Sequence, residues 1–92
     1  LILNDSGYGM IRWKQKDMQM QDFGLKFDNP DFVKLAESFG AKGYKIKKTE
    51  DLTKILKKAL DSKGVNIIEC PIDYSQNFKN LGADLQKEIN NL

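Results

Sequence analysis

A short polar turn near the start of the chain, residues 4–7, carries the most specific chemistry in the sequence. Its sequence is Asn-Asp-Ser-Gly, which places a carboxylate at Asp5 and a backbone carbonyl two residues later at Gly7. Hard divalent cations such as Mg²⁺ prefer oxygen ligands and usually bind through one or two carboxylates together with substrate phosphates. Asp5 and Gly7 are therefore candidate metal ligands. An ordinary surface turn has the same composition, and these four residues alone leave both interpretations open.

The turn lies between a predicted strand and a predicted helix. Residues 1–3 are Leu-Ile-Leu, which is typical of the end of a buried strand, and residues 9–16 can form a helix. The first N–H groups of such a helix have no partner inside it and favour an anion such as phosphate. In open α/β sheets, ligands bind where strands end and helices begin. The segment 1–16 therefore predicts a corner for a metal and a phosphate together.

Two further helices are predicted from start signals and apolar stripes. Asn29 and Pro30 are typical of an N-cap and a first helical position, and Gly40 is predicted to end that helix. Thr49 is predicted to cap the second helix. Apolar residues recur at helical spacing in both. The first stripe comprises Phe32, Leu35, Ala36 and Phe39, and the second comprises Leu52, Ile55, Leu56, Ala59 and Leu60.

Two more strands complete the predicted layer. Alternating residues indicate a short strand at 44–47, and an apolar run indicates another at 65–70, whose pairing Pro71 should limit. The order strand, helix, helix, strand, helix, strand is typical of an α/β fold whose parallel strands are joined by crossover helices. The tail is predicted to hold a last helix with a narrow stripe, formed by Leu81, Leu85 and Ile89.

The composition is that of one small globular domain. Of the 92 residues, 40% are hydrophobic and 30% are charged. No apolar run approaches the ~20 residues of a membrane span, and no signal-peptide pattern is present, so we expect no membrane association. Cys70 is predicted to be a buried strand thiol, because the chain has no histidine to activate it. A single cysteine suits a reducing cytosol, and we expect a cytoplasmic protein.

Eight lysines cluster between residues 42 and 63. A net charge of +2 does not by itself indicate nucleic-acid binding. A basic face can contact phosphates, but no arginine accompanies these lysines and most of them alternate with predicted core positions, which favours a solvated face. A free-standing module that binds an acidic partner remains an alternative hypothesis. The lysines are Lys42, Lys45, Lys47, Lys48, Lys54, Lys57, Lys58 and Lys63.

The segment 3–11 resembles the second half of the thiamine diphosphate motif, and the remainder of the chain resembles the catabolic acetolactate synthases. The similar segments occur in the order found in that family and extend over nearly the whole chain. Their combined run is therefore much more specific than the turn alone. The segments are 3–11, 23–27, 29–33, 36–44 and 70–75.

The resemblance implies a partial three-layer α/β/α fold. Residues 1–92 would be the C-terminal part of a thiamine diphosphate-binding domain, with a terminal helical tail at 76–92. It also implies a parent enzyme that condenses two pyruvates to 2-acetolactate with release of carbon dioxide. Thiamine diphosphate and Mg²⁺ would be its cofactors, and a homo-oligomer, dimer or tetramer, its assembly, without nucleic acid or membrane as partners.

The resemblance also assigns residues to the site. Asp5 and Gly7 would be metal ligands, Tyr8, Gly9 and Met10 would bind the cofactor, and no catalytic residue is expected in this chain. Asp5 stands where many family members have Asn, and Trp13 lies one place earlier than the tryptophan of the flavin-containing branch. Both departures favour the flavin-independent branch, so FAD is not expected.

The chain is expected to be an inactive fragment. It begins at Leu1 inside a predicted strand, and it lacks both the Gly-Asp-Gly half of the motif and the cofactor-activating glutamate that the family supplies from another domain. Another thiamine diphosphate enzyme, of the pyruvate oxidase or decarboxylase type, remains an alternative for the parent.

Overall fold

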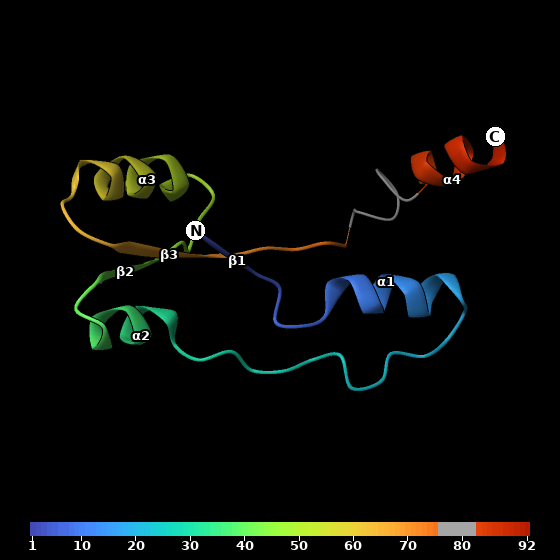
Figure 1. The fold of residues 1–92 in the computed structure, drawn as a ribbon, viewed down its shortest axis with the longest axis horizontal. Coiled ribbons are helices and arrows are strands. Elements are labelled where there is room, and N and C mark those ends of the chain that lie inside the picture. The colour runs from blue at the N-terminus through green and yellow to red at the C-terminus, as the bar shows by residue number, and fades with distance from the viewer. Residues whose placement is uncertain (76–82) are drawn as a thin grey trace. The chain divides into compact units, whose positions relative to one another are not determined.

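A three-stranded parallel sheet organises the first of two units in the computed structural model, which describes residues 1–75 and 83–92 (Figure 1). This unit comprises Leu1–Gly7 and Lys26–Ile72, and the second comprises Tyr8–Leu25 and Asp73–Leu92. The chain therefore leaves the first unit immediately after Gly7.

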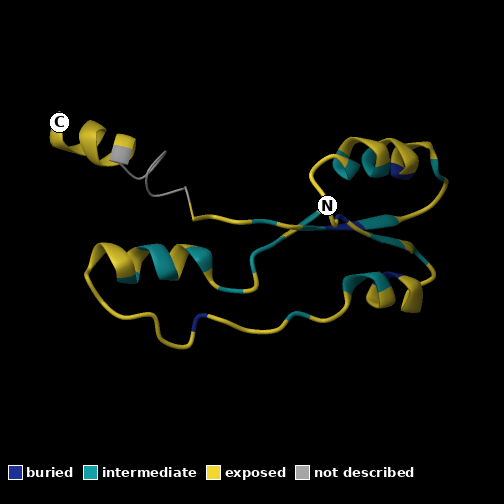
Figure 2. Ribbon diagram, turned by 180° about the vertical axis from the view of Figure 1, so that it is seen from behind, coloured by how far each residue is buried: buried dark blue, intermediate teal, exposed yellow. Residues whose placement is uncertain are grey.

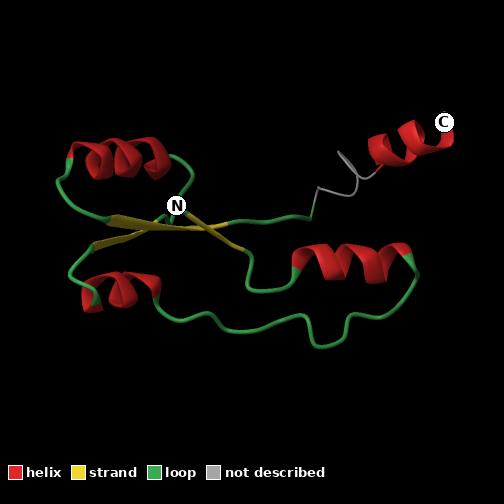
Figure 3. Cartoon of the chain, viewed as in Figure 1, coloured by secondary structure: helices red, strands yellow, loops and turns green. Residues whose placement is uncertain are grey.

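The sheet has the strand order β1-β3-β2, and β3 runs parallel to both neighbours. The strands are β1 (Ile2–Asn4), β2 (Lys42–Lys45) and β3 (Asn66–Pro71). Helices α2 (Phe32–Ser38) and α3 (Asp51–Asp61) connect them and cover opposite faces of the sheet (Figures 1 and 3). The first unit is therefore a small three-layer α/β/α structure, which confirms the predicted fold class.

Each face of the sheet packs against one helix. On the α3 face, Ile46, Ala59 and Ile68 form the main hydrophobic cluster. On the α2 face, Ala36 is fully buried, and Gly43 approaches α2 so closely that an added Cβ would lie 2.7 Å from the Val33 Cα. The sides of α2 and α3 that face the sheet are the less exposed ones (Figure 2). The half-buried residues around the main cluster are Tyr44, Leu52, Ile55, Leu56 and Cys70.

The predicted apolar stripes are only partly correct. The α3 stripe is confirmed up to Ala59, but Leu60 is 84% exposed, because the last turn of α3 contacts the sheet through Ala59. In α2 the prediction for Phe39 is wrong: this residue is the C-cap, outside the helix, and is 80% exposed. Gly40 follows with a φ of 75°, which confirms the left-handed residue expected at the helix end.

Both predicted helix caps are wrong by one or two residues. The N-cap of α2 is Asp31, whose carboxylate accepts hydrogen bonds from the N–H groups of Val33 and Lys34, both at 3.1 Å. Asn29 does not cap, because its side chain is bonded to Asn4 instead. In α3 the N-cap position is Glu50 rather than Thr49, and no side chain caps it.

The two strand predictions also shift. The strand expected at 44–47 is β2, which lies two residues earlier in the chain. The strand expected at 65–70 is β3, which is shifted by one residue at each end, and its pairing ends at Pro71 as expected, with Pro71 opposite Asn4. The N–H of Ile72 donates to the Asn4 carbonyl at 2.9 Å, so pairing continues to the point where β1 ends.

The second unit contains α1 (Gly9–Asp17) and α4 (Ala83–Asn90). The helix predicted at 9–16 is therefore confirmed. Part of the predicted tail helix, including Leu81, lies outside the described residues. Leu85 and Ile89, the remaining members of its stripe, are both exposed.

Candidate functional site

The candidate metal ligands lie together on the turn that follows β1. The N–H of Gly7 donates to Asp5 Oδ1 at 3.3 Å, and the N–H of Ser6 donates to Asn4 Oδ1 at 2.9 Å. Each of these bonds joins a side-chain oxygen to the backbone two residues later, which is the local bonding that Asn and Asp favour in turns. Ser6 has a φ of 56°, a left-handed conformation uncommon for a residue with a side chain. The turn is therefore tightly bent and held by its own side chains.

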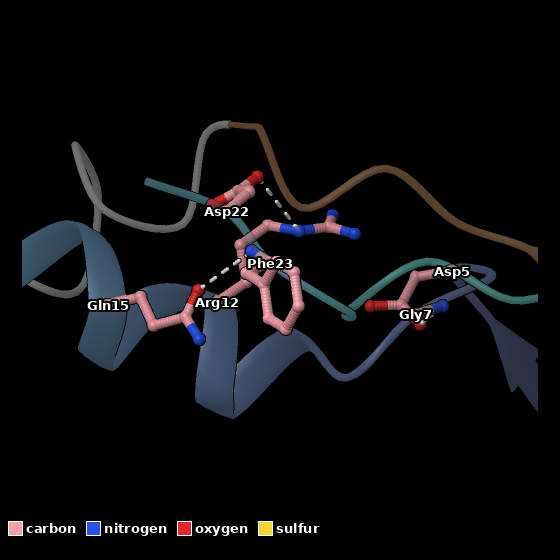
Figure 4. Close-up of polar contacts among 6 residues, drawn as sticks. All are labelled: Asp5, Gly7, Arg12, Gln15, Asp22 and Phe23. Carbon is pink, nitrogen blue, oxygen red and sulfur yellow. Dashed lines mark hydrogen bonds and ion pairs between the residues drawn. The ribbon is translucent and has the colours of Figure 1, made fainter. Parts of the chain in front are cut away.

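The oxygen atoms of this turn suit a hard cation. Asp5 and Gly7 are both half-buried, and both belong to the first unit. Figure 4 shows their side-chain and backbone atoms close together on the turn. Within the described part of the chain, no hydrogen bond uses the Gly7 carbonyl oxygen. One carboxylate and one free carbonyl are the ligand types that Mg²⁺ accepts.

The ligand set is incomplete within the described residues. They contain no group of three or more His, Cys, Asp or Glu side chains that could hold a metal ion. Asp5 and Gly7 would supply two of the roughly six positions of an octahedral ion. The remaining ligands must come from a bound phosphate, from water or from other protein groups.

The candidate cofactor-binding residues begin the second unit. Tyr8 is the N-cap of α1, Gly9 and Met10 form its first turn, and no side chain caps the helix. The first turn of α1 contains no acidic residue, whereas its last turn contains Lys14 and Lys16. The positive end of the helix dipole therefore has no carboxylate in its own first turn, which suits an anion. The Gly7–Tyr8 peptide bond joins this group to the metal-ligand turn.

Local contacts shape the segment that follows α1. Arg12 Nε lies 3.8 Å from Asp22 Oδ2, and Gln15 Oε1 accepts a hydrogen bond from the N–H of Phe23 at 3.4 Å (Figure 4). Trp13, which lies on α1, is half-buried. Its indole N–H is buried and has no hydrogen-bond partner among the described residues.

Three polar side chains next to the turn form a network that the sequence did not predict. Asn4 Nδ2 donates to Glu69 Oε1 at 2.8 Å, and Asn29 Nδ2 donates to Asn4 Oδ1 at 2.7 Å. Glu69 is only 6% exposed. A carboxylate inside the apolar run 65–70 was the signal in the sequence, since buried glutamates are rare without a partner.

An open pocket of about 310 Å³ lies over this network, at the edge of the sheet where β1 and β2 end. Ligands of open parallel sheets bind at this edge. The lining is polar and belongs entirely to the first unit. It comprises Asn4, Ser6, Asp28, Asn29, Pro30, Asp31, Lys45 and Glu69.

The remaining candidates have ordinary surroundings. Cys70 is a free, half-buried thiol on β3. The clustered lysines are exposed, as the solvated-face interpretation predicts, and Lys58 lies over the Tyr44 ring, 5.8 Å from its centroid. No helix in the described ranges has the length and apolar character that a membrane span requires.

Comparisons with known proteins point to one family. Residues 1–70 match the family model described as "Thiamine pyrophosphate enzyme, C-terminal TPP binding domain". The chain is 38% identical, over 93 aligned residues, to the acetolactate synthase of Bacillus subtilis (strain 168), covering 100% of this chain and 16% of that protein.

Two further relatives carry similar names. The catabolic acetolactate synthase of Raoultella terrigena is 32% identical over 77 residues, with 84% of this chain and 14% of the relative covered. The mitochondrial acetolactate synthase catalytic subunit of Saccharomyces cerevisiae (strain ATCC 204508 / S288c) is 38% identical over 74 residues, with 79% and 11% covered. The chain thus spans no more than 16% of the length of these three relatives. The comparisons do not favour a free-standing basic module.

Proposed function

Because the chain belongs to the thiamine pyrophosphate enzyme family, within its C-terminal TPP binding domain, we propose that its Asp5–Gly7 turn holds the metal ion that anchors the cofactor diphosphate in an acetolactate synthase. One observation carries this assignment: the Asp5 carboxylate and the Gly7 carbonyl share a turn at the end of a parallel strand. The Gly7 carbonyl has no hydrogen-bond partner among the described residues. Thiamine diphosphate presents phosphate oxygens that can complete the coordination of Mg²⁺.

Asp5 and Gly7 have different tasks in this proposal. Asp5 contributes a negative charge, which offsets the positive charge of the metal ion. Its carboxylate also competes with water for a coordination position on the ion. Gly7 contributes an uncharged carbonyl oxygen and, through its N–H, a hydrogen bond that orients the Asp5 carboxylate. The oxygen donors of the turn are thereby fixed before a metal ion arrives, which lowers the entropic cost of binding.

Tyr8, Gly9 and Met10 would bind the cofactor itself. No side chain caps α1 and its first turn contains no acidic residue, so the N–H groups of Gly9 and Met10 are suitable donors to phosphate oxygens. Gly9 has no side chain to keep a phosphate away from the backbone. The side chains of Tyr8 and Met10 are both exposed, and we propose that they contact the rest of the cofactor.

The longer protein would use this anchor in a condensation. Thiamine diphosphate, when bound, supplies the carbon nucleophile that lets one pyruvate lose carbon dioxide and the remaining two-carbon unit join a second pyruvate, giving 2-acetolactate. The residues of this chain hold the cofactor and its metal ion, while activating groups come from elsewhere in the protein. We propose a cytoplasmic homo-oligomer as its working form, without FAD.

Calorimetry on the intact protein that contains this chain tests the proposal. Mg²⁺ is titrated in the presence of thiamine diphosphate, with the original protein and with Asp5→Ala. We expect the variant to weaken metal binding by at least tenfold, since it removes the charged ligand. Asp61→Asn is the matched control. Asp61 is the last residue of α3 and comes before the start of β3, at the end of the sheet away from the turn, so the metal affinity of this variant should be unchanged.

The outcomes separate clearly. Equal affinities for the original protein and Asp5→Ala would remove Asp5 from the metal site. An equal loss in Asp61→Asn would mean that general charge, rather than ligation, causes the effect.

A further inference from the structure

We propose that Glu69, which lies on β3 and outside the turn, is a positioning residue for the metal-binding turn and acts on it through Asn4. This inference rests on the proposed function of Asp5 and Gly7 and adds a residue whose role the family assignment does not give. Its basis is a continuous series of hydrogen bonds from a buried carboxylate to the backbone of the turn.

The burial of Glu69 calls for an explanation. Its relative exposure is 6%, and among the described residues it is the one buried residue with a charged side chain. No Lys or Arg nitrogen of the described residues lies within 4.0 Å of its carboxylate. Burying a carboxylate costs free energy unless hydrogen bonds offset the loss of water. Its bond to the Asn4 amide, at 2.8 Å, is the contact that offsets this cost.

The register of the sheet makes this contact possible. Ile2 of β1 and Lys45 of β2 lie opposite Glu69 on its two sides. Side chains two residues apart on a strand share a face, so Asn4 lies on the same face as Ile2 and diagonally next to Glu69. β3 thereby supports a side chain at the end of β1.

Asn4 passes this constraint to the turn. With its Nδ2 group held by Glu69, its Oδ1 atom is directed to accept hydrogen bonds from the N–H of Ser6, at 2.9 Å, and from Asn29 Nδ2, at 2.7 Å. One planar amide is therefore fixed at both ends. Rotation of this amide would break all three bonds at once.

The turn needs such support because of its backbone. Ser6 has a φ of 56°, which disfavours a residue with a side chain. The bond from Ser6 N–H to Asn4 helps to hold this conformation, and the conformation sets the positions of Asp5 and Gly7. Loss of Glu69 would free the Asn4 amide and let the turn relax, so that the two ligand oxygens lose their preset spacing.

Metal affinity in the intact protein is the readout. Mn²⁺ is used as the probe, in the presence of thiamine diphosphate, and its binding is followed by electron paramagnetic resonance. We expect Glu69→Leu to weaken Mn²⁺ binding about 10-fold or more, the usual effect of removing a group that orients a metal ligand. Ile68→Ala is the matched control: it also disturbs β3, but on the α3 face, so it should lower stability and leave Mn²⁺ affinity within about twofold.

Two further variants test the same role, so that the result does not depend on whether Glu69→Leu folds. Asn4→Asp keeps the oxygen that accepts from Ser6 and Asn29 but places a second carboxylate against Glu69, so Mn²⁺ binding should weaken. Adding Glu69→Gln supplies a donor to that new carboxylate and restores the original net charge. We expect the double variant to recover most of the affinity lost in Asn4→Asp.

The results distinguish this inference from the one on which it depends. If Asp5→Ala weakens Mn²⁺ binding, but Glu69→Leu behaves like Ile68→Ala and the double variant gives no recovery, the role of Glu69 is overturned and the metal site stands. If Asp5→Ala leaves Mn²⁺ affinity unchanged, the proposed function fails, and the role of Glu69 fails with it.

Discussion

The Asn4 amide donates to the Glu69 carboxylate at 2.8 Å across 65 positions of the chain. The bond links the end of the first strand to the last strand of the sheet. The candidate metal ligands come directly after Asn4, so their geometry depends on β3, a strand much later in the chain. The site and the packing of the first unit are therefore coupled, and variants that disturb this packing are informative about both.

Gly43 lies where β2 and α2 make their closest approach. A Cβ at this position would lie 2.7 Å from Val33 Cα and 2.8 Å from Val33 O, both of which are backbone atoms. Gly43→Ala should therefore destabilise the protein by about 1–3 kcal/mol, the usual cost of overpacking. Urea unfolding of the intact protein measures this.

A second substitution tests the cause. Shortening the Val33 side chain would not relieve a clash with its backbone, so Val33→Ala should not rescue Gly43→Ala. Rescue would mean that the side chain is the obstacle. Thr53→Ala, on the exposed side of α3, is the control and should change stability by less than about 0.5 kcal/mol.

Asp31 and Glu50 occupy the same position in two helices but differ in bonding. Asp31 accepts two backbone hydrogen bonds at the start of α2, whereas Glu50 accepts none at the start of α3. Asp31→Ala should cost about 0.5–2 kcal/mol of stability, as for other side-chain caps. Glu50→Ala, the matched control, should cost less than about 0.5 kcal/mol. Equal losses in thermal or urea unfolding would show that the Asp31 carboxylate does not act as a cap.

Local signals in the sequence were sufficient to predict the elements of the first unit. Each of its strands and helices has an apolar pattern of its own, and Gly40 marks a helix end by its left-handed backbone. The exact caps were less predictable. Asn29 is a good cap by composition, but a contact with Asn4, distant in the chain, occupies its side chain. Such a contact exists only in the folded sheet.

The candidate site was predictable in part for the same reason. Asp5 and Gly7 could be identified because turn, strand and helix signals coincide within a few neighbouring residues. The role of Glu69 depends on which strands are neighbours and on their register, and neither is encoded locally. The carboxylate within an apolar strand was visible, but its partner was not.

The pKa of Asp73 should lie below the ordinary value for an aspartate. Its carboxylate accepts hydrogen bonds from the N–H of Ser75 at 2.8 Å and from the Ser75 hydroxyl at 2.9 Å. These bonds, the backbone one first, lower the pKa of Asp73 below its ordinary value of 3.8. Because the folded pKa is the lower one, the associated stability is present above the unfolded pKa and is lost as the pH falls through the folded pKa.

A carboxyl-carbon NMR titration checks this assignment. Ser75→Ala removes the hydroxyl donor and keeps the backbone N–H, so the pKa of Asp73 should rise part of the way towards 3.8. Thr53→Ala serves as the control and should leave the Asp73 titration unchanged. A pKa of Asp73 that does not respond to Ser75→Ala would assign the whole effect to the backbone.

The last prediction concerns the 92-residue chain produced by itself, which should self-associate through β1. β1 is an edge strand of the β1-β3-β2 sheet, and Leu1 and Leu3 beside that edge are 66% and 58% exposed. An open edge with apolar side chains is a template for pairing with another chain. Sedimentation velocity over a concentration series should show association, and Leu3→Lys should reduce it, because a charge on an edge strand opposes pairing. Leu60→Lys is the control, since Leu60 is equally apolar and 84% exposed but lies on α3.

The same preparation should bind thiamine diphosphate weakly, because Asp5 and Gly7 fill only two of about six metal positions. A stable monomer with micromolar cofactor affinity would contradict both expectations and would mean that this chain contains a complete site.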